Sequence, residues 1–251
     1  MGQLSYDERV CVQFLNKFKD WTDSTWGFRV YGTYSRTQAQ VDAYGQADGQ
    51  NAQEVAVKDT ARFQAILERL HAHAKDNLRY RHPAPYNQQL IDTLRLQPAA
   101  YLPGASLAEV CTQFRQRYAV ILDSEQQEKG ALLDAEMSSP KYSWCLVIDD
   151  EALQSIEAAP QPIGLSPQAG VHPSRLALQA EDAFVKLLNA AYVTMEKPFV
   201  LAAKGCNTRW RNEWTGWLKF SPVMLMEVFD ETLSGDIEIY FRGHDKLLEF
   251  P

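Results

Sequence analysis

Three consecutive acidic residues follow the most apolar stretch of the sequence. Asp149, Asp150 and Glu151 come directly after 142–148, a run of aromatic and apolar residues typical of a buried strand. Carboxylates at the end of a strand can bind a metal, orient an amine or act as a general base. They can equally be the negative charges that stabilise the first turn of a helix. Because adjacent residues do not share a face, at most two of the three can enter one pocket.

A second set of chemically useful side chains lies in segment 26–35. Arg29, Tyr31 and Thr33 alternate with apolar or small residues, and Tyr34 follows them. On a strand the first three would lie on one face. A Tyr hydroxyl there could donate a proton or position a carbonyl group. The alternative is ordinary cross-strand pairing on a half-exposed sheet.

Arginine and tryptophan are interleaved in segment 209–217, which contains Arg209, Arg211 and Trp214. Such a segment suits stacking on bases and contact with phosphates, and so predicts a nucleic-acid contact. The alternative is that its tryptophans pack in the core. A second basic run, 79–82, is expected to be a solvated helix end.

Other patterns argue against several common chemistries. The four cysteines stand far apart in sequence: Cys11, Cys111, Cys145 and Cys206. This scatter is typical of reduced, mostly buried thiols rather than a disulfide framework. His71 and His73 stand two apart on an expected helix, so they point to different faces and make a poor metal pair. Since the common nucleotide-binding, zinc-protease and hydrolase motifs are missing too, we expect no metal and no cofactor.

The composition is that of a folded globular protein. The chain has 251 residues, of which 45% are hydrophobic and 23% charged. Its formal charge of −7 opposes indiscriminate binding of nucleic acid but permits a local basic patch. No apolar run approaches the roughly 18 residues that a membrane span requires. The first residues do not match a secretory signal, so a cytoplasmic location is expected.

Periodicity and turn residues predict the elements that must position these side chains. Helices are expected at 4–22, 55–76, 87–95, 106–115 and 221–235, and one more is expected to begin at 149–151. Strands are expected at 26–35, 118–123, 142–148, 184–193, 216–220 and 237–242. Polar or Gly/Pro-rich loops are expected at 42–54 and 159–174. We therefore expect a single α+β domain over 1–251, with a mixed, mostly antiparallel sheet packed against several amphipathic helices.

Three segments carry a resemblance to a known group of proteins. Segment 26–34, W-G-F-R-V-Y-G-T-Y, resembles the W-G-F-x-(V/I)-Y-R-T-x-Y strand of a group of small fungal proteins. In the same order, 142–153 resembles that group's apolar strand followed by Asp and a short helix, and 216–220 resembles its G-W-M-x-V strand. The fungal arginine-containing cyclodipeptide synthases lie within or near this group. Two departures from the group's patterns are Leu153, where the synthases' D-D-x-x-E has its Glu, and Gly32, where the wider group has Arg.

The resemblance implies an enzyme of fungal secondary metabolism. It would use arginyl-tRNA and a second aminoacyl-tRNA to make an arginine-containing cyclic dipeptide, a diketopiperazine, without a cofactor. The acidic residues 149–151 would hold the arginyl guanidinium by bidentate bonds, and Tyr31 or Tyr34 would assist proton transfer or position the ester carbonyl. Segment 209–214 would contact the tRNA.

The same interpretation assigns substrate contacts to four side chains: Arg29, Thr33, Trp144 and Trp217. Two other functions remain open. One is a non-catalytic module of the same fold that binds a small molecule or a protein. The other is a small cyclase or isomerase that acts on a finished metabolite.

Overall fold

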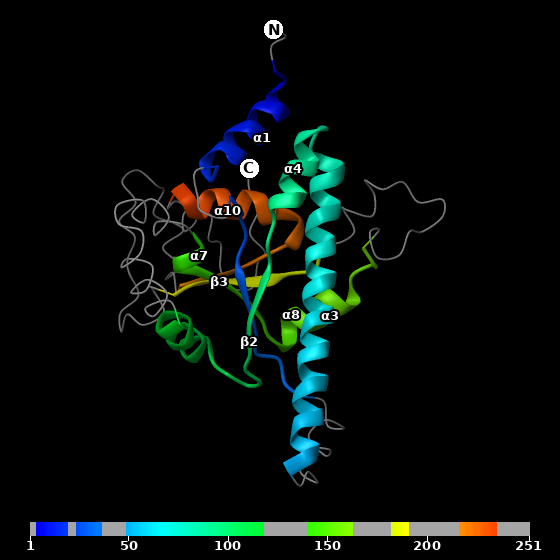
Figure 1. The fold of residues 1–251 in the computed structure, drawn as a ribbon, viewed down its shortest axis with the longest axis vertical. Helices are drawn as coiled ribbons and strands as arrows, with labels where there is room; N and C mark the ends of the chain where they lie inside the picture. Colours follow the sequence, from blue (N-terminus) through cyan, green and yellow to red (C-terminus); the bar gives the residue numbers. More distant parts are fainter. Residues whose placement is uncertain are drawn as a thin grey trace, which may run out of the picture.

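The computed structural model describes residues 4–19, 24–36, 49–117, 140–162, 182–190 and 216–234. In these ranges a five-stranded sheet is covered by helices on both faces (Figure 1). The strands are β1 (Arg29–Gly32), β2 (Gln97–Tyr101), β3 (Trp144–Ile148), β4 (Val185–Asn189) and β5 (Trp217–Phe220). The α+β class is therefore confirmed.

The helices range from a single turn to a rod along the long axis of the molecule. They are α1 (Tyr6–Lys17), α3 (Gly49–Arg81), α4 (Tyr86–Thr93), α7 (Pro140–Ser143), α8 (Asp150–Ala158), the 3₁₀ helix η3 (Pro222–Met224) and α10 (Leu225–Ser234). Residues 107–117 form a further helix. None of the described helices is both long enough and apolar enough to cross a membrane.

The strand order is β2-β1-β3-β4-β5, with β1 parallel to both of its neighbours. The pairs β3–β4 and β4–β5 are antiparallel. The sheet is therefore mixed, and the expectation of a mostly antiparallel sheet was wrong. The physical reason is that helices connect β1 to β2 and β2 to β3, and such crossovers return the chain in the same direction.

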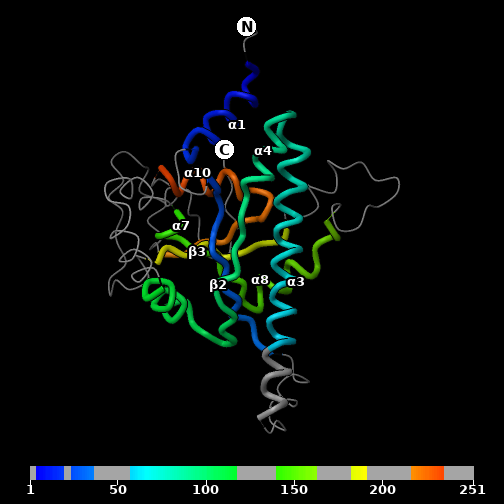
Figure 2. Tube along the Cα trace, viewed as in Figure 1, coloured from blue at the N-terminus to red at the C-terminus, as the bar shows by residue number. Residues whose placement is uncertain are grey.

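The two faces of the sheet support cores of unequal size. Val30, Leu146 and Leu187 belong to the larger core, together with apolar residues of α1, α3, α4, α8 and α10. Tyr31 and Val147 alternate with them and belong to a smaller core with Phe114 of the 107–117 helix. That helix is green in Figure 2 and lies away from α3. The alternation follows from the period of two in a strand.

The edge strand β2 was not expected from the sequence. The segment contains Pro98, which lacks an N–H and was interpreted as a break. At the edge of a sheet a proline is tolerated, because one side of the strand makes no pairing bonds. The register shifts by one residue here, since Val30 pairs with Pro98 but Tyr31 pairs with Ala100.

Several boundaries differ from the expected ones. The segment 49–54 is helical and belongs to α3, although 42–54 was expected to be a loop. Its Ala, Gln and Glu residues have good helix propensity and extend the helix without an apolar stripe. The strand expected at 26–35 is shorter because Gly27 has a φ of +127°. The strands expected at 118–123 and 237–242, and most of the 159–174 loop, lie outside the described residues.

Gly27 lets two backbone segments approach closely. The Trp26 N–H donates to Thr93 O at 3.0 Å, and the Arg95 N–H donates to Trp26 O at 2.8 Å. A Cβ on Gly27 would lie 2.1 Å from the Arg95 carbonyl oxygen. The glycine of the W-G-F segment is therefore needed for packing.

Gly27→Ala should destabilise the protein by about 3 kcal/mol, because both the positive φ and the clash with Arg95 oppose a side chain. Gly104→Ala is the matched control. Gly104 also has a positive φ, +77°, but nothing lies within 4 Å of an added Cβ. It should cost only about 1 kcal/mol. Urea unfolding measures both, and equal losses would contradict the clash.

Candidate functional site

The fold brings the ends of β1 and β3 together at one edge of the sheet. From β1 the chain crosses to β2 on one side, and it later returns to β3 on the other side. Ligands of α/β sheets bind outside the carboxyl ends of strands where the direction of winding reverses in this way. The Thr33 N–H donates to Ile148 O at 2.8 Å and joins the two strand ends. The candidate site is therefore formed by 33–36 and 149–151.

The expected helix start after β3 is confirmed. Asp149 is the N-cap of α8, and its Oδ1 accepts a hydrogen bond from the Ala152 N–H at 3.0 Å. Asp150 and Glu151 occupy the first turn. Carboxylates at these positions interact favourably with the helix dipole.

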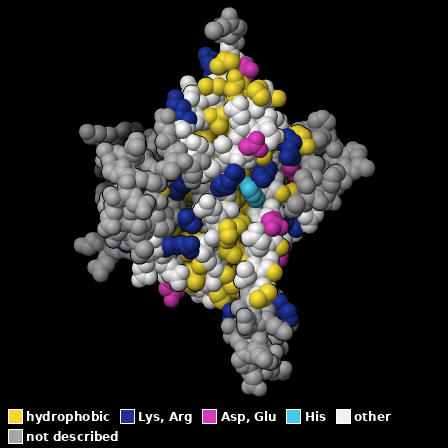
Figure 3. Space-filling view, in the orientation of Figure 1, with side chains coloured by type: hydrophobic (Ala, Val, Ile, Leu, Met, Phe, Trp, Pro, Cys, Tyr) yellow, Lys and Arg dark blue, Asp and Glu magenta, His cyan; other side chains and the backbone are white. Residues whose placement is uncertain are grey.

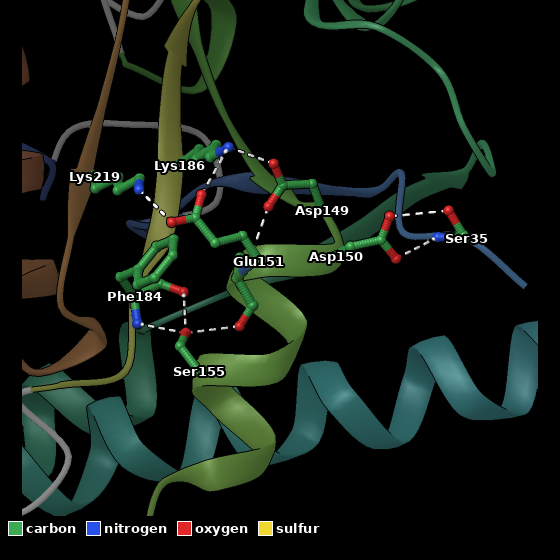
Figure 4. Close-up of polar contacts among 9 residues, drawn as sticks. Ser35, Asp149, Asp150, Glu151, Ser155, Phe184, Lys186 and Lys219 are labelled. Carbon is green, nitrogen blue, oxygen red and sulfur yellow. Dashed lines mark hydrogen bonds and ion pairs between the residues drawn. The ribbon is translucent and has the colours of Figure 1, made fainter. Parts of the chain in front are cut away.

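Two lysines that sequence analysis did not single out neutralise two of these carboxylates (Figure 4). Lys186 on β4 forms an ion pair with Asp149 Oδ2. Lys219 on β5 lies 2.5 Å from Glu151 Oε1, and the second oxygen of Glu151 lies 3.6 Å from Lys186 Nζ. The lysine side chains are only 10–11% exposed. Ammonium groups at such depth need carboxylate partners.

Aromatic rings complete the surroundings of both lysines. Lys186 Nζ lies 4.8 Å from the centre of the Trp217 ring, and Lys219 Nζ lies 4.7 Å from that of Phe184. Cation–π contacts at these distances are favourable. Lys186, Lys219, Asp149 and Glu151 are hereafter called the lysine–carboxylate cluster. Trp217, an expected substrate contact, packs against this cluster through Lys186.

Asp150 has a different environment from its two neighbours. It is exposed, and its carboxylate accepts from the Ser35 N–H at 2.8 Å and from the Ser35 hydroxyl at 2.9 Å. No Lys or Arg forms an ion pair with it among the described residues. Each carboxylate oxygen keeps a second lone pair for a further donor. Of the three acidic residues 149–151, Asp150 is thus the one best able to bind a cation from solution.

The two expected catalytic tyrosines lie on opposite faces of the sheet. Tyr31 packs in the smaller core, where burial raises the pKa of its hydroxyl to about 12. Tyr34 packs in the larger core, with the Arg62 guanidinium 5.1 Å from its ring centre. Burial raises the pKa of Tyr34, and its buried hydroxyl has no hydrogen-bond partner in the part of the chain that the structure describes. Both hydroxyls are protonated at neutral pH and neither joins the lysine–carboxylate cluster.

The remaining expected site residues are dispersed. Arg29 and Trp144 begin β1 and β3, so they lie at the amino ends of these strands and away from the candidate site. Thr33 is buried at the carboxyl end of β1. The expected nucleic-acid contacts Arg209, Arg211 and Trp214 lie outside the described residues.

The sequence does carry a signal for the missed lysines. Lys186 and Lys219 each interrupt an apolar strand, in Val-Lys-Leu-Leu and Trp-Leu-Lys-Phe. A lysine between two apolar neighbours on a buried strand implies a carboxylate partner. Ser35 gave no comparable signal, because its role depends on where α8 lies.

The described cysteines and His73 are buried, and His71 and His82 are half-buried. Burial raises the pKa of Cys145 well above its ordinary value and that of Cys111 to about 11. Burial, aided by Lys75, lowers the pKa of His71 to about 4, and burial with Arg69 does the same for His73. Within the described ranges, no group of three or more His, Cys, Asp or Glu side chains could hold a metal ion.

Comparison with family models, with curated proteins and with solved structures finds no match to this chain. The resemblance to the fungal group consequently rests on the three segments alone. In the fold these segments form β1, β3 with the start of α8, and β5. They therefore include residues on both sides of the candidate site and part of the lysine–carboxylate cluster.

Asp149→Ala should destabilise the protein by about 2 kcal/mol, because it removes the cap of α8 and leaves Lys186 with a weaker partner. Asp150→Ala is the control on the same turn and should cost less than half as much, since no buried cation depends on it. Thermal or urea unfolding measures both. A larger loss for Asp150→Ala would contradict these assignments.

His73 should make stability depend on pH. Its folded pKa of about 4 lies below the 6.5 of an exposed His, so its contribution is complete above pH 6.5 and is lost as the pH falls toward 4. The change from pH 7.5 to pH 5 should be about 2 kcal/mol. His73→Leu should reduce the pH dependence by that amount, measured by urea unfolding at both pH values. An unchanged dependence would show that His73 titrates normally in the folded protein.

Proposed function

We propose that this protein is a cytosolic enzyme that makes an arginine-containing cyclic dipeptide from aminoacyl-tRNA, and that the arginyl group binds at the ends of β1 and β3. The observation that carries this proposal is the exposed carboxylate of Asp150 at the winding reversal of the sheet. The resemblance of three segments to the fungal group supplies the reaction.

Charge counting supports a cationic ligand at this place. Of the three carboxylates of 149–151, two pair with the two lysine ammonium groups, so one negative charge of this segment is left without a lysine partner. Asp150 carries that charge, because the lysines contact only Asp149 and Glu151. A guanidinium could bond to the two oxygens of Asp150 on the sides away from Ser35. Guanidinium binding, which the sequence assigned to all three acidic residues, is therefore assigned to Asp150.

The reaction itself needs two acyl transfers. The amine of one aminoacyl group attacks the ester carbonyl carbon of the other, which forms an amide bond and releases a tRNA 3′-hydroxyl. The amine of the resulting dipeptidyl ester then attacks its own ester, which closes the ring and releases the second tRNA. Binding of the arginyl side chain would hold the ester in reach of the amine, and such proximity can supply much of the acceleration.

The body of the tRNA would contact basic surface away from the acidic residues 149–151. Segment 209–214 is the contact that the sequence predicts. On the described part of the face drawn in Figure 3, Lys and Arg side chains also gather near the middle, beside a histidine. Local groups of cations allow a protein with an overall negative charge to attract a polyanion.

A second candidate function is a non-catalytic module that binds an arginine-bearing small molecule. The observation that favours it is the burial of Tyr31 and Tyr34, whose hydroxyls retain their protons at neutral pH. With neither tyrosine in contact with Asp150, the described site offers a cation-binding carboxylate more clearly than it offers an acid or a base. Both candidates share the Asp150 site and differ only in turnover.

Expression of the chain in a bacterial host tests the proposal, because the host supplies every aminoacyl-tRNA. Mass spectrometry should detect an arginine-containing cyclic dipeptide in the medium. Asp150→Asn should reduce the product at least tenfold. Glu157→Gln removes the charge of an exposed residue farther along α8 and should leave the amount of product unchanged. A folded protein that binds arginine esters without forming product would favour the binding module. Full product from Asp150→Asn would contradict the role of Asp150.

A further inference from the structure

Two like charges oppose each other in the lysine–carboxylate cluster. Lys186 and Lys219 are paired residues on neighbouring antiparallel strands, so their side chains extend from the same face of the sheet. Both residues are buried, with 9% and 8% of their surface exposed. Like charges directly opposite each other destabilise a sheet, and burial strengthens their repulsion. The pair therefore requires anionic groups close to both nitrogens.

The two carboxylates that meet this requirement are held very differently. Asp149 is fixed, since one of its oxygens caps α8 and the other pairs with Lys186. Among the described residues, the Glu151 carboxylate contacts the two lysines, at 2.5 and 3.6 Å, and its side chain is 55% exposed. Its carboxylate lies within ion-pair distance of both nitrogens, at the end of a side chain of which about half is exposed (Figure 4).

We infer that Lys186 and Lys219 form a binding site for a phosphate group, and that Glu151 occupies this site until the phosphate displaces it. Rotation of the Glu151 side chain into solvent would uncover both ammonium groups, while Asp149 would stay in place. The cluster would then hold two positive charges and one negative charge. A phosphate offers separate oxygens to the two lysines and carries at least one negative charge, so it would satisfy the pair as Glu151 does.

The aromatic neighbours suit this exchange. Trp217 and Phe184 lie against the lysine nitrogens at 4.8 and 4.7 Å and hold them in position. Their contacts do not involve Glu151, so they persist when the carboxylate leaves. The lysine ammonium groups would therefore be arranged for an anion before it arrives.

The inference deepens the proposed function and rests on it for the source of the phosphate, which would be the acceptor end of a tRNA whose arginyl group meets Asp150. The residues are suitably arranged, because Glu151 and Asp150 are neighbours in the first turn of α8. A free phosphate compound would present the same chemistry to the lysines. Binding experiments can separate these two sources.

The test is to titrate the purified full chain with inorganic phosphate and to measure the binding affinity by calorimetry. Glu151→Gln keeps the length of the side chain and removes the competing charge, so it should bind phosphate about tenfold more tightly than the natural chain. Lys219→Met should abolish the binding. Glu157→Gln, the matched control on the same helix, should bind as the natural chain does. Circular dichroism confirms that each variant is folded.

A Glu151→Gln affinity equal to that of the natural chain would overturn the inference. Should Lys219→Met fail to fold, Lys219→Gln combined with Glu151→Gln removes both charges together and should restore folding without phosphate binding. Phosphate binding by that folded double variant at the Glu151→Gln level would also overturn the inference.

A short RNA ending in CCA identifies the source of the phosphate. Tighter binding of this RNA by Glu151→Gln supports a nucleic-acid phosphate, and tightening for inorganic phosphate alone supports a free phosphate compound. The outcome is independent of the proposed reaction. If Glu151→Gln binds phosphate more tightly but no cyclic dipeptide forms, the phosphate site stands and the synthase proposal fails. If product forms and Glu151→Gln binds phosphate no more tightly than the natural chain, the synthase proposal stands and the phosphate site fails.

Discussion

The neutralisation of two nearly buried lysines is the interaction on which the candidate site depends. Lys186 and Lys219 extend from paired positions of β4 and β5, and they find their partners at the start of α8. A buried ammonium group is costly without a carboxylate partner. The need to pair both lysines therefore fixes the start of α8 against β4 and β5. It also uses two of the three acidic residues. Asp150 is left exposed for another role.

The topology of the sheet explains why that carboxylate lies where a ligand can reach it. β1 is an interior strand and lies parallel to both of its neighbours, so the chain reverses its direction of winding between β1 and β3. Ser35 and Asp150 are 115 positions apart in the sequence, yet Ser35 donates two hydrogen bonds to Asp150. The site is consequently a product of strand order, supported by a larger apolar core on one face of the sheet and a smaller one on the other.

Local patterns were sufficient to predict some of these features. The apolar run before Asp149 predicted both the strand β3 and the helix that follows it, because burial and the helix dipole act over a few neighbouring residues. Non-local features were not predictable in this way. β2 was missed since Pro98 is acceptable only at an edge, and the edge is known only from the strand order. The pairing of Lys219 with Glu151 depends equally on the register of β4 and β5.

The expected roles of Tyr31 and Tyr34 show the same limit. Both follow a strand pattern that predicts alternation, but only the presence of helices on both faces decides that each hydroxyl is buried. A chemically useful residue type on a strand therefore says little until the covering layers are known. The charged residues at strand ends are more informative, because strand ends meet solvent at a predictable place.

The most direct test of the central claim is to map where an arginine ester binds. The amide signals of the isotope-labelled chain would be recorded by NMR during titration with L-arginine ethyl ester, which carries the guanidinium and the ester but no nucleic acid. The account predicts that the largest shifts occur at 33–36 and 149–152, with the Ser35 amide among them because it donates to Asp150. Shifts confined to the amino ends of β1 and β3, around Arg29 and Trp144, would contradict it.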